Sequence, residues 1–230
     1  MSNTSACNLT SPSSLTKTDD SFSKPLTPKY LTILDWDNTL LPTSWVVKRG
    51  CTLDICIDAD TQELLKPVEK SAYELITKAL SIGEVIIITN GELGWIEKSC
   101  EHYFPRISFE LLHKLKRMSA RSTFEFMYSN PEEWKLHAFN QEICLFMHRI
   151  PPTSQKFIMS IGDSIYERKA LFKVTHNYKS VVPKSIKLIE EPSLSQLERQ
   201  HKLITDNFAE VTGMSDSLDL MITITEINGI

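Results

Sequence analysis

The strongest constraint on this chain is an apolar run that ends abruptly in two acids one residue apart. The run extends from Tyr30 to Leu34, and the acids are Asp35 and Asp37. From Thr32 onward its residues are β-branched or apolar, as in a strand buried on both faces of a parallel sheet. Asp35 would then emerge at the carboxyl end of that strand, which is the edge where open α/β sheets bind ligands.

Two carboxylates at the end of one strand repel each other, so this pattern requires a compensating positive charge. Side chains two residues apart on a strand end point the same way, which brings the two acids close together. A bound divalent cation is the usual solution, because hard oxygen ligands suit Mg²⁺ and the ion inverts the local electrostatics. The sequence therefore predicts a Mg²⁺ site that includes Asp35 and Asp37.

Length and composition are those of one sizeable globular domain. The 230 residues are 41% hydrophobic and 23% charged, and the formal net charge is −4. This balance predicts neither a nucleic-acid partner nor a polybasic membrane anchor. No apolar run approaches the ~20 residues that span a bilayer. Five widely spread cysteines without a CxxC pair favour a reducing compartment, and no secretory signal is visible, so we expect a cytoplasmic protein.

The chain predicts one folded domain between two less regular ends. Residues 1–28 are rich in Ser, Thr and Pro without periodicity, which is typical of a disordered tail before a domain over 29–230. The segment around 42–60 predicts a short hairpin with Gly50 at its turn, lying over the acid pair and too short for a full cap domain. A helical extension is expected around 190–230.

Two further buried strands are predicted, and each ends in a polar side chain. Residues 84–88 contain four consecutive β-branched residues and lead into Thr89. Residues 155–161 are largely apolar and are followed closely by Asp163. Because the carboxyl ends of parallel strands meet at one edge of a sheet, both polar side chains should lie beside Asp35.

Helical patterns separate these strands. They begin at Asp60, near Leu93 and at Asn130, where an N-cap residue precedes a proline and two acids. Shorter strands are expected at 115–120 and, as an edge strand, at 178–182. The alternation predicts an α/β fold: a Rossmann-like three-layer sandwich with a central, mainly parallel sheet and a small or minimal cap.

Four motifs therefore occur in order, and each closes a predicted strand or opens a helix. Their residues are, in order, Asp35, Asp37, Thr89, Lys135, Asp163 and Glu167. This arrangement resembles the haloacid dehalogenase superfamily of phosphohydrolases over residues 29–182. Any one of the motifs recurs by chance, whereas four in order, each in a fitting structural context, carry the resemblance.

The resemblance implies a division of labour between the two acids of the first motif. Asp35 would be the nucleophile that attacks phosphorus and becomes an aspartyl phosphate. Asp37 would protonate the leaving oxygen and then activate water. The resemblance also implies that Mg²⁺ is bound by the side chains of Asp35 and Asp163 and by the backbone carbonyl of Asp37.

The remaining motif residues would act on the phosphoryl group or support the metal. Thr89 and the backbone N–H of Asn90 would hydrogen-bond the phosphoryl oxygens. Lys135 would neutralise the charge shared by the nucleophile and the transferring group, which accounts for a cation in the first turn of a helix, where the dipole disfavours it. Glu167 would orient Asp163 or a metal-bound water.

Three other lysines are alternatives for the third motif. They are Lys114, Lys116 and Lys156, which also lie between the second and last motifs. Lys156 begins the last strand and should face the opposite end of the sheet. Lys116 lies too early in the chain unless the helix is assigned wrongly. These positions favour Lys135.

The leading hypothesis is a Mg²⁺-dependent phosphatase that hydrolyses a phosphate monoester, either a small molecule or a phosphoprotein. The small cap is similar to that of superfamily members that act on macromolecules or borrow a lid from a partner subunit, so a homo-oligomer is left open. A phosphoprotein phosphatase of the aspartate-based type is the enzymatic alternative, although Asn38 stands where those enzymes have an acid. A non-catalytic binding or scaffold protein that retains the fold is the third hypothesis.

Overall fold

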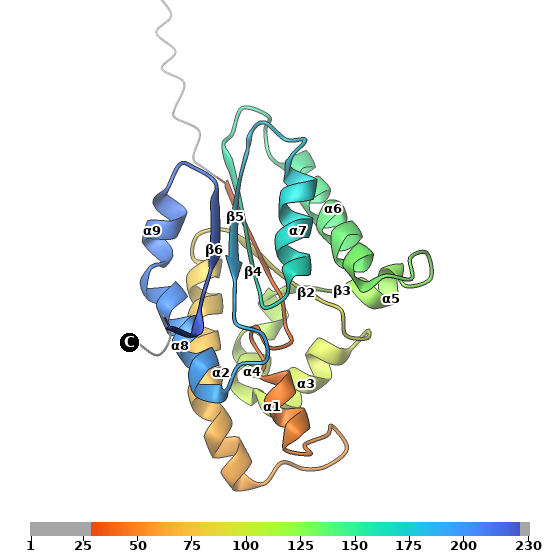
Figure 1. The fold of residues 1–230 in the computed structure, drawn as a ribbon, viewed down its shortest axis with the longest axis vertical. Helices are drawn as coiled ribbons and strands as arrows, with labels where there is room; N and C mark the ends of the chain where they lie inside the picture. The colour runs from red at the N-terminus through yellow and green to blue at the C-terminus, as the bar shows by residue number, and fades with distance from the viewer. Residues whose placement is uncertain (1–28, 226–230) are drawn as a thin grey trace, which may run out of the picture.

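The computed structural model describes residues 29–225 and shows an α/β fold (Figure 1). Its strands are β1 (Lys29–Leu34), β2 (Glu84–Thr89), β3 (Lys116–Ser119), β4 (Lys156–Gly162), β5 (Val181–Lys187) and β6 (Leu218–Met221). Within the described residues these strands form one sheet in the order β3-β2-β1-β4-β5-β6. Every neighbouring pair is parallel.

Helices cover both faces of this sheet. They are α1 (Thr43–Lys48), α2 (Ala59–Leu80), α3 (Trp95–Tyr103), α4 (Pro105–Glu110), the 3₁₀ helix η1 (Leu112–Lys114), α5 (Ala120–Phe124), α6 (Pro131–Arg149), α7 (Ile165–Thr175), α8 (Leu194–Asp206) and α9 (Phe208–Gly213). One face packs against α2, α3, α4, α8 and α9, and the other against α5, α6 and α7. The predicted Rossmann-like three-layer α/β sandwich is therefore confirmed.

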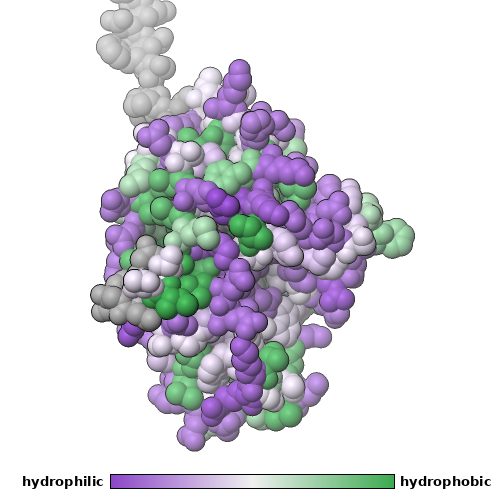
Figure 2. Space-filling view, viewed as in Figure 1, coloured by the Kyte–Doolittle hydropathy of each residue, from purple (hydrophilic) through white to green (hydrophobic). Residues whose placement is uncertain are grey.

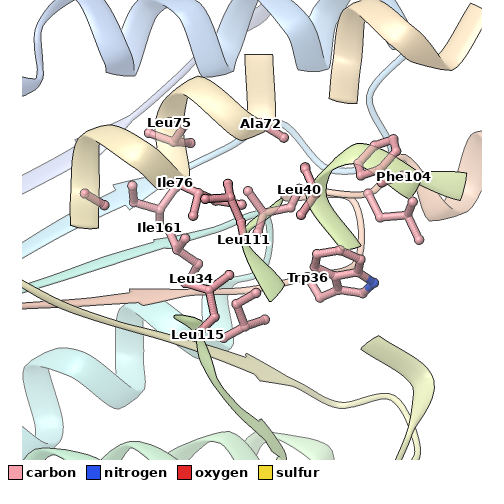
Figure 3. Close-up of a cluster of buried hydrophobic side chains, with 14 of the residues drawn as sticks. Leu34, Trp36, Leu40, Ala72, Leu75, Ile76, Phe104, Leu111, Leu115 and Ile161 are labelled. Atoms are coloured by element: carbon pink, nitrogen blue, oxygen red, sulfur yellow. The ribbon is translucent and has the colours of Figure 1, made fainter. Parts of the chain in front are cut away.

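Alternating side chains explain why β1 is buried on both faces. Leu31 and Ile33 join the apolar cluster beneath α5, α6 and α7. Leu34 joins the cluster on the opposite face, which contains Ile76 of α2 and is drawn in Figure 3. Packing against both helical layers fixes the strand, so the residue that follows it, Asp35, is held at the carboxyl edge of the sheet.

The strand order reverses beside β1. The chain first moves outward from β1 to β2 and β3, and then returns through α6 to β4 on the other side of β1. In open α/β sheets, ligands bind outside the carboxyl ends of the strands at such a reversal. Thr89, Asp35 and Asp163 end or follow the three adjacent strands β2, β1 and β4 at this edge.

The hairpin predicted around 42–60 is wrong, because this segment contains the helix α1. The carbonyl of Pro42 accepts hydrogen bonds from the backbone N–H groups of Trp45 and Val46, each at 3.0 Å, which is a helical pattern. Trp45-Val46-Val47 had suggested a strand, but the preference of such residues for strands is weak and depends on context. The helical turn places a threonine, Thr43, close to the first acid motif.

The predicted C-terminal helical extension is only partly correct. α8 and α9 are helical, but β6 follows them and pairs in parallel with β5. β6 forms an edge of the sheet, and Figure 2 shows apolar side chains on the surface beside it, where Leu220 and Met221 are exposed. The segment therefore completes the central sheet, in addition to covering it.

The edge strand predicted at 178–182 is also misplaced. The observed strand β5 runs from Val181 to Lys187 and lies between β4 and β6. Pro183 and Lys184 obscured it, because proline lacks a backbone donor and lysine is rarely buried. In the fold, the Lys184 ammonium donates hydrogen bonds to two carbonyls of the α9–β6 connection.

Other expectations about the chain have mixed outcomes. The predicted tail over residues 1–28 lies outside the described residues. The short strand expected at 115–120 is confirmed as β3, at an edge of the sheet. In the part of the chain that the structure describes, no helix combines the length and the apolar character needed to cross a membrane.

The tight approach of Gly83 to β1 gives a prediction about folding. A Cβ atom at Gly83 would lie 2.3 Å from the carbonyl oxygen of Tyr30, and a backbone atom cannot rotate away. We expect Gly83→Ala to lower the free energy of unfolding by about 1–3 kcal/mol. At Gly213 in α9 nothing lies within 4 Å of such an atom, so Gly213→Ala should be neutral or stabilising by up to about 1 kcal/mol. Equal urea midpoints for the two variants would contradict this.

Candidate active site

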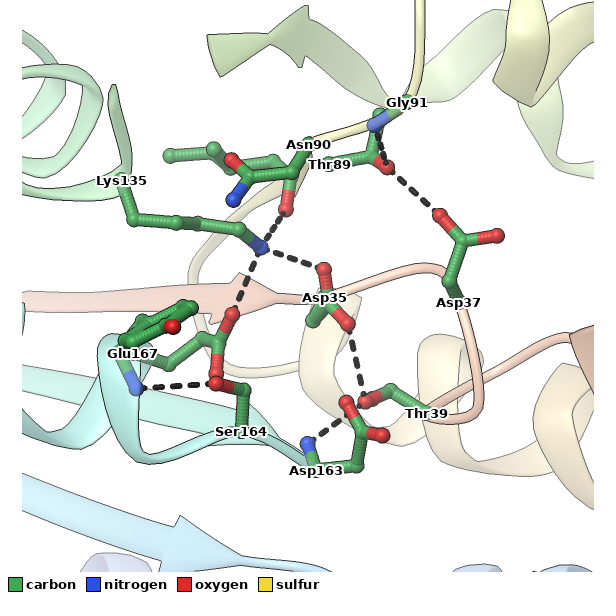
Figure 4. Close-up of polar contacts among 12 residues, drawn as sticks. Asp35, Asp37, Thr39, Thr89, Asn90, Gly91, Lys135, Asp163, Ser164 and Glu167 are labelled. Atoms are coloured by element: carbon green, nitrogen blue, oxygen red, sulfur yellow. Dashed lines mark hydrogen bonds and ion pairs between the residues drawn. The ribbon is translucent and has the colours of Figure 1, made fainter. Parts of the chain in front are cut away.

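A buried lysine connects three of the elements that meet at the carboxyl edge. The ammonium of Lys135 lies 2.5 Å from Oδ1 of Asp35, 2.9 Å from Oε1 of Glu167 and 2.6 Å from the carbonyl oxygen of Ile88 (Figure 4). The lysine side chain is only 2% exposed. Its ion pairs and hydrogen bond tie α6 to the end of β1, to β2 and to α7.

The sequence at the start of α6 explains how a lysine reaches this position. Asn130 caps the helix by accepting a hydrogen bond from the backbone N–H of Glu132, and Pro131 occupies the first position. The first turn thereby points at the sheet edge. Helix-dipole energetics disfavour a cation in this turn, but the carboxylates of Asp35 and Glu167 stabilise Lys135 there.

Thr39 links the first and last acids of the site. Its hydroxyl donates to Oδ2 of Asp35 at 3.3 Å and accepts a hydrogen bond from the backbone N–H of Asp163 at 3.0 Å. The ammonium of Lys187 at the end of β5 donates to the carbonyl of Asp163 at 2.9 Å. Among the described residues no group donates a hydrogen bond to the Asp163 carboxylate, which leaves both of its oxygens available to a ligand.

Gly162 allows α7 to approach the loop that carries Asp163. A Cβ atom there would lie 2.7 Å from Cγ of Glu167, so a larger residue would displace the glutamate. Glu167 is itself buried, and its Oε2 has no hydrogen-bond partner although its Oε1 pairs with Lys135. The last motif therefore presents a second carboxylate with an unsatisfied oxygen.

The carboxylate of Asp37 is held by three side chains from three different elements. Thr43 of α1 and Trp95 of α3 donate to Oδ1 at 2.7 and 2.8 Å. Thr89 at the end of β2 donates to Oδ2 at 2.8 Å and accepts a hydrogen bond from the backbone N–H of Gly91. Asp37 is partly exposed, so this carboxylate lies between the buried cluster and solvent.

The electrostatics of the buried cluster show a shortage of positive charge. Burial, and then the neighbouring carboxylates of Glu167, Asp163 and Asp37, raise the pKa of Asp35 well above its ordinary value, although Lys135 opposes this. Burial, followed by Glu167, likewise raises the pKa of Asp163 to about 7. Burial lowers the pKa of Lys135, but the two carboxylates that it contacts raise it above its ordinary value. Such a cluster is relieved by an additional cation.

The donors at this edge are suited to a hard divalent cation. In residues 29–225 no group of three or more His, Cys, Asp and Glu side chains has the arrangement of a metal site. The donors that the resemblance predicts for Mg²⁺ include only two such side chains, the carboxylates of Asp35 and Asp163. The third predicted donor is the backbone carbonyl of Asp37. The free carboxylate of Asp163 and the unsatisfied Oε2 of Glu167 fit a cation or its bound water.

Most of the residues predicted from the sequence meet at this edge. They are Asp35, Asp37, Thr89, Lys135, Asp163 and Glu167, and their catalytic roles stay predictions. Asn90 lies beside them, but its side chain donates to the carbonyl of Pro131 and its Oδ1 is buried without a partner. The other lysines lie elsewhere: Lys156 donates to carbonyls of the loop before β4, and Lys116 pairs with Glu142.

Sequence reasoning missed four residues that contact the site. They are Thr39, Thr43, Trp95 and Lys187. Thr39 lies within the first motif, and its position there was the one available signal. The others approach from separate elements, and nothing in their local sequence distinguishes them from ordinary surface or core residues.

Comparisons of this chain with protein-family models, with curated proteins and with solved structures found no match. The resemblance to the haloacid dehalogenase superfamily therefore stays a prediction. Its support is the order of the four motifs along the chain and the meeting of their residues at one sheet edge.

A buried histidine of α8 contacts the backbone of the loop that carries Asp35 and Thr39. Nε2 of His201 in α8 lies 2.7 Å from the carbonyl oxygen of Thr39, and Nδ1 lies 2.9 Å from Oγ of Ser71 in α2. A carbonyl only accepts, so Nε2 of His201 carries a proton, and Oγ of Ser71 lies within hydrogen-bonding distance of both Nδ1 and the carbonyl of Val68. Burial lowers the pKa of His201 to about 4.

His201 gives a prediction for stability against pH. The unfolded chain binds a proton near the ordinary pKa of 6.5, whereas the folded chain binds it near 4. Stability from this residue is thus complete above about pH 6.5 and is lost as the pH falls toward 4, by about 3 kcal/mol in total. We expect His201→Gln to lack this part of the acid-induced loss in denaturant titrations at pH 7 and pH 4. His148→Gln, at an exposed position, should keep it; identical losses in all three proteins would refute the assignment.

Proposed function

We propose that this protein is a Mg²⁺-dependent phosphatase that hydrolyses a phosphate monoester through an aspartyl phosphate on Asp35. The observation that carries the proposal is the buried ion-paired cluster in which Lys135 bridges Asp35 and Glu167. Asp163 and Asp37 lie at the same edge of the sheet. A nucleophilic carboxylate, a charge-neutralising cation and a second carboxyl within one site are the requirements of this chemistry.

In the first half-reaction a carboxylate oxygen of Asp35 attacks phosphorus. A new bond forms between that oxygen and phosphorus, and the bond between phosphorus and the ester oxygen breaks with its electron pair going to the leaving oxygen. Asp37 gives its proton to that oxygen, which departs as an alcohol. Lys135 stabilises the negative charge shared by Asp35 and the transferring group.

The second half-reaction restores the enzyme. Asp37, now ionised, takes a proton from a water molecule whose oxygen attacks the phosphorus of the aspartyl phosphate. The bond between phosphorus and Asp35 breaks, inorganic phosphate leaves and Asp35 is again a carboxylate. Because Asp37 lies at the partly exposed side of the cluster, water and leaving group reach it from solvent.

Mg²⁺ would be held by the carboxylates of Asp35 and Asp163 and by the backbone carbonyl of Asp37. When bound, it would supply the positive charge that the cluster lacks, keep the nucleophile ionised and offset the charge of the phosphoryl oxygens. Glu167, with its unsatisfied Oε2, would orient Asp163 or a water bound to the ion.

The small size of the cap supports a substrate that does not need to be enclosed. Between Asp37 and α2 the chain adds one helix of six residues, α1, together with loops. A phosphorylated protein segment is therefore as acceptable as a small phosphate ester, and the phosphoprotein phosphatase is the more specific form of the proposal.

The proposal predicts Mg²⁺-dependent release of phosphate from a panel of phosphomonoesters and phosphopeptides. Asp35→Asn should abolish turnover because it removes the nucleophile, and chelation of Mg²⁺ by EDTA should do the same. Lys135→Ala should reduce kcat by a factor of about 10³ or more, since an uncompensated charge would remain at the nucleophile. The measurement is phosphate release under saturating substrate.

Lys156 provides the matched control for Lys135. It is also fully buried, but its ammonium donates only to the carbonyls of Pro151 and Ser154, at the opposite end of β4. Lys156→Ala should retain turnover per folded molecule. Absence of activity in the wild-type protein across the whole panel would contradict the enzyme proposal and favour a binding or scaffold protein.

A further inference from the structure

The two oxygens of the Asp37 carboxylate are held very differently. Oδ1 accepts two hydrogen bonds, from the hydroxyl of Thr43 at 2.7 Å and from the indole N–H of Trp95 at 2.8 Å. Oδ2 accepts one, from the hydroxyl of Thr89 at 2.8 Å. One oxygen is thus anchored from two helices, while the other depends on a single hydroxyl.

The anchor formed by Trp95 is built into the packing of the second motif. Its indole ring lies so close to Gly91 that a Cβ atom there would approach Cδ1 to 2.4 Å. The preceding residue, Gly94, has φ +83, a left-handed conformation that favours glycine and starts α3 in this direction. The ring therefore has a fixed position against the loop that follows Thr89.

The hydrogen bond that Thr89 donates to Oδ2 is lost when the same hydroxyl donates to a bound phosphoryl group. A hydroxyl has one proton to donate, and Thr89 now gives it to Asp37. If that proton turns to a phosphoryl oxygen, Oδ2 loses its partner among these three donors. Oδ1 keeps both of its own, so the carboxyl group stays oriented while one oxygen becomes free.

We propose that Trp95 and Thr43 are positioning residues that fix Oδ1 of Asp37 and reserve Oδ2 for proton exchange. This inference rests on the proposed phosphatase function. Oδ2 gives its proton to the leaving oxygen as the bond between phosphorus and that oxygen breaks, and then takes a proton from the attacking water. Neither positioning residue exchanges a proton, and each acts only through the geometry of Asp37.

The test compares two substrates of similar shape that differ in their need for a proton. Phenyl phosphate releases a basic phenolate that requires protonation, whereas 4-nitrophenyl phosphate releases a stable anion that does not. In Trp95→Phe and in Thr43→Val, kcat/KM for phenyl phosphate should fall about tenfold, while kcat/KM for 4-nitrophenyl phosphate should fall less than about twofold. A variant that merely lost structure would lose both activities in the same proportion.

Two further variants complete the comparison. Asp37→Asn should show the same selectivity more strongly, because it removes the acid itself. The substrate ratio is kcat/KM for 4-nitrophenyl phosphate divided by kcat/KM for phenyl phosphate. Trp134→Phe makes the same chemical change at a half-buried tryptophan whose indole donates to the carbonyl of Tyr128, so its substrate ratio should equal that of the wild type. If Trp95→Phe does not fold, Thr43→Val alone carries the comparison.

The results separate this inference from the function on which it rests. An inactive wild-type protein would overturn the proposed function. An active wild type with a raised substrate ratio in Asp37→Asn, but an unchanged ratio in Trp95→Phe and Thr43→Val, would overturn the positioning role alone. An unchanged ratio in Asp37→Asn would overturn both the role of Asp37 as the acid and the inference. A raised ratio in all three variants supports the inference.

Discussion

The site depends on one buried ammonium group among several carboxylates. Lys135 is almost without exposure and contacts Asp35, Glu167 and the end of β2. Removal of one partner from such a pair leaves an uncompensated charge in the interior and typically costs about 3–5 kcal/mol. The carboxylates of the cluster outnumber its cations, and their mutual repulsion and burial disfavour the ionised forms of Asp35 and Asp163. Under the proposed function, the excess negative charge would hold a metal ion, and Lys135 would face the transferring phosphoryl group.

The sheet makes this concentration of charge possible. β1 and β4 lie at the reversal of strand order, so the chain places Asp35 and Asp163 just after the ends of adjacent strands, and both strands pack against helices on both faces. Supports then arrive from outside the sheet: α6 brings Lys135, and α8 brings His201 to the carbonyl of Thr39. The rigidity of the site comes from both helical layers at once.

The parts of this fold that sequence reasoning predicted are those where local pattern and tertiary packing agree. Apolar runs identified β1, β2 and β4, and the cap at Asn130 identified α6 and hence Lys135. The errors occurred where contacts distant in sequence override local preference: Lys184 is buried because carbonyls 30 and 32 residues away accept hydrogen bonds from its ammonium. Trp95 was missed for the same reason, since it bonds a carboxylate 58 residues away.

The most direct test of this account is the site of covalent phosphorylation during turnover. The protein is mixed with 4-nitrophenyl phosphate and Mg²⁺, and the reaction is quenched with acid. The mass of the peptide that contains Asp35 is then measured by mass spectrometry. The account predicts one added phosphoryl group on Asp35, more of it in Asp37→Asn, where water is activated slowly, and none in Asp35→Asn. Turnover with a phosphoryl group on another residue, or with unmodified Asp35 in Asp37→Asn, would contradict it.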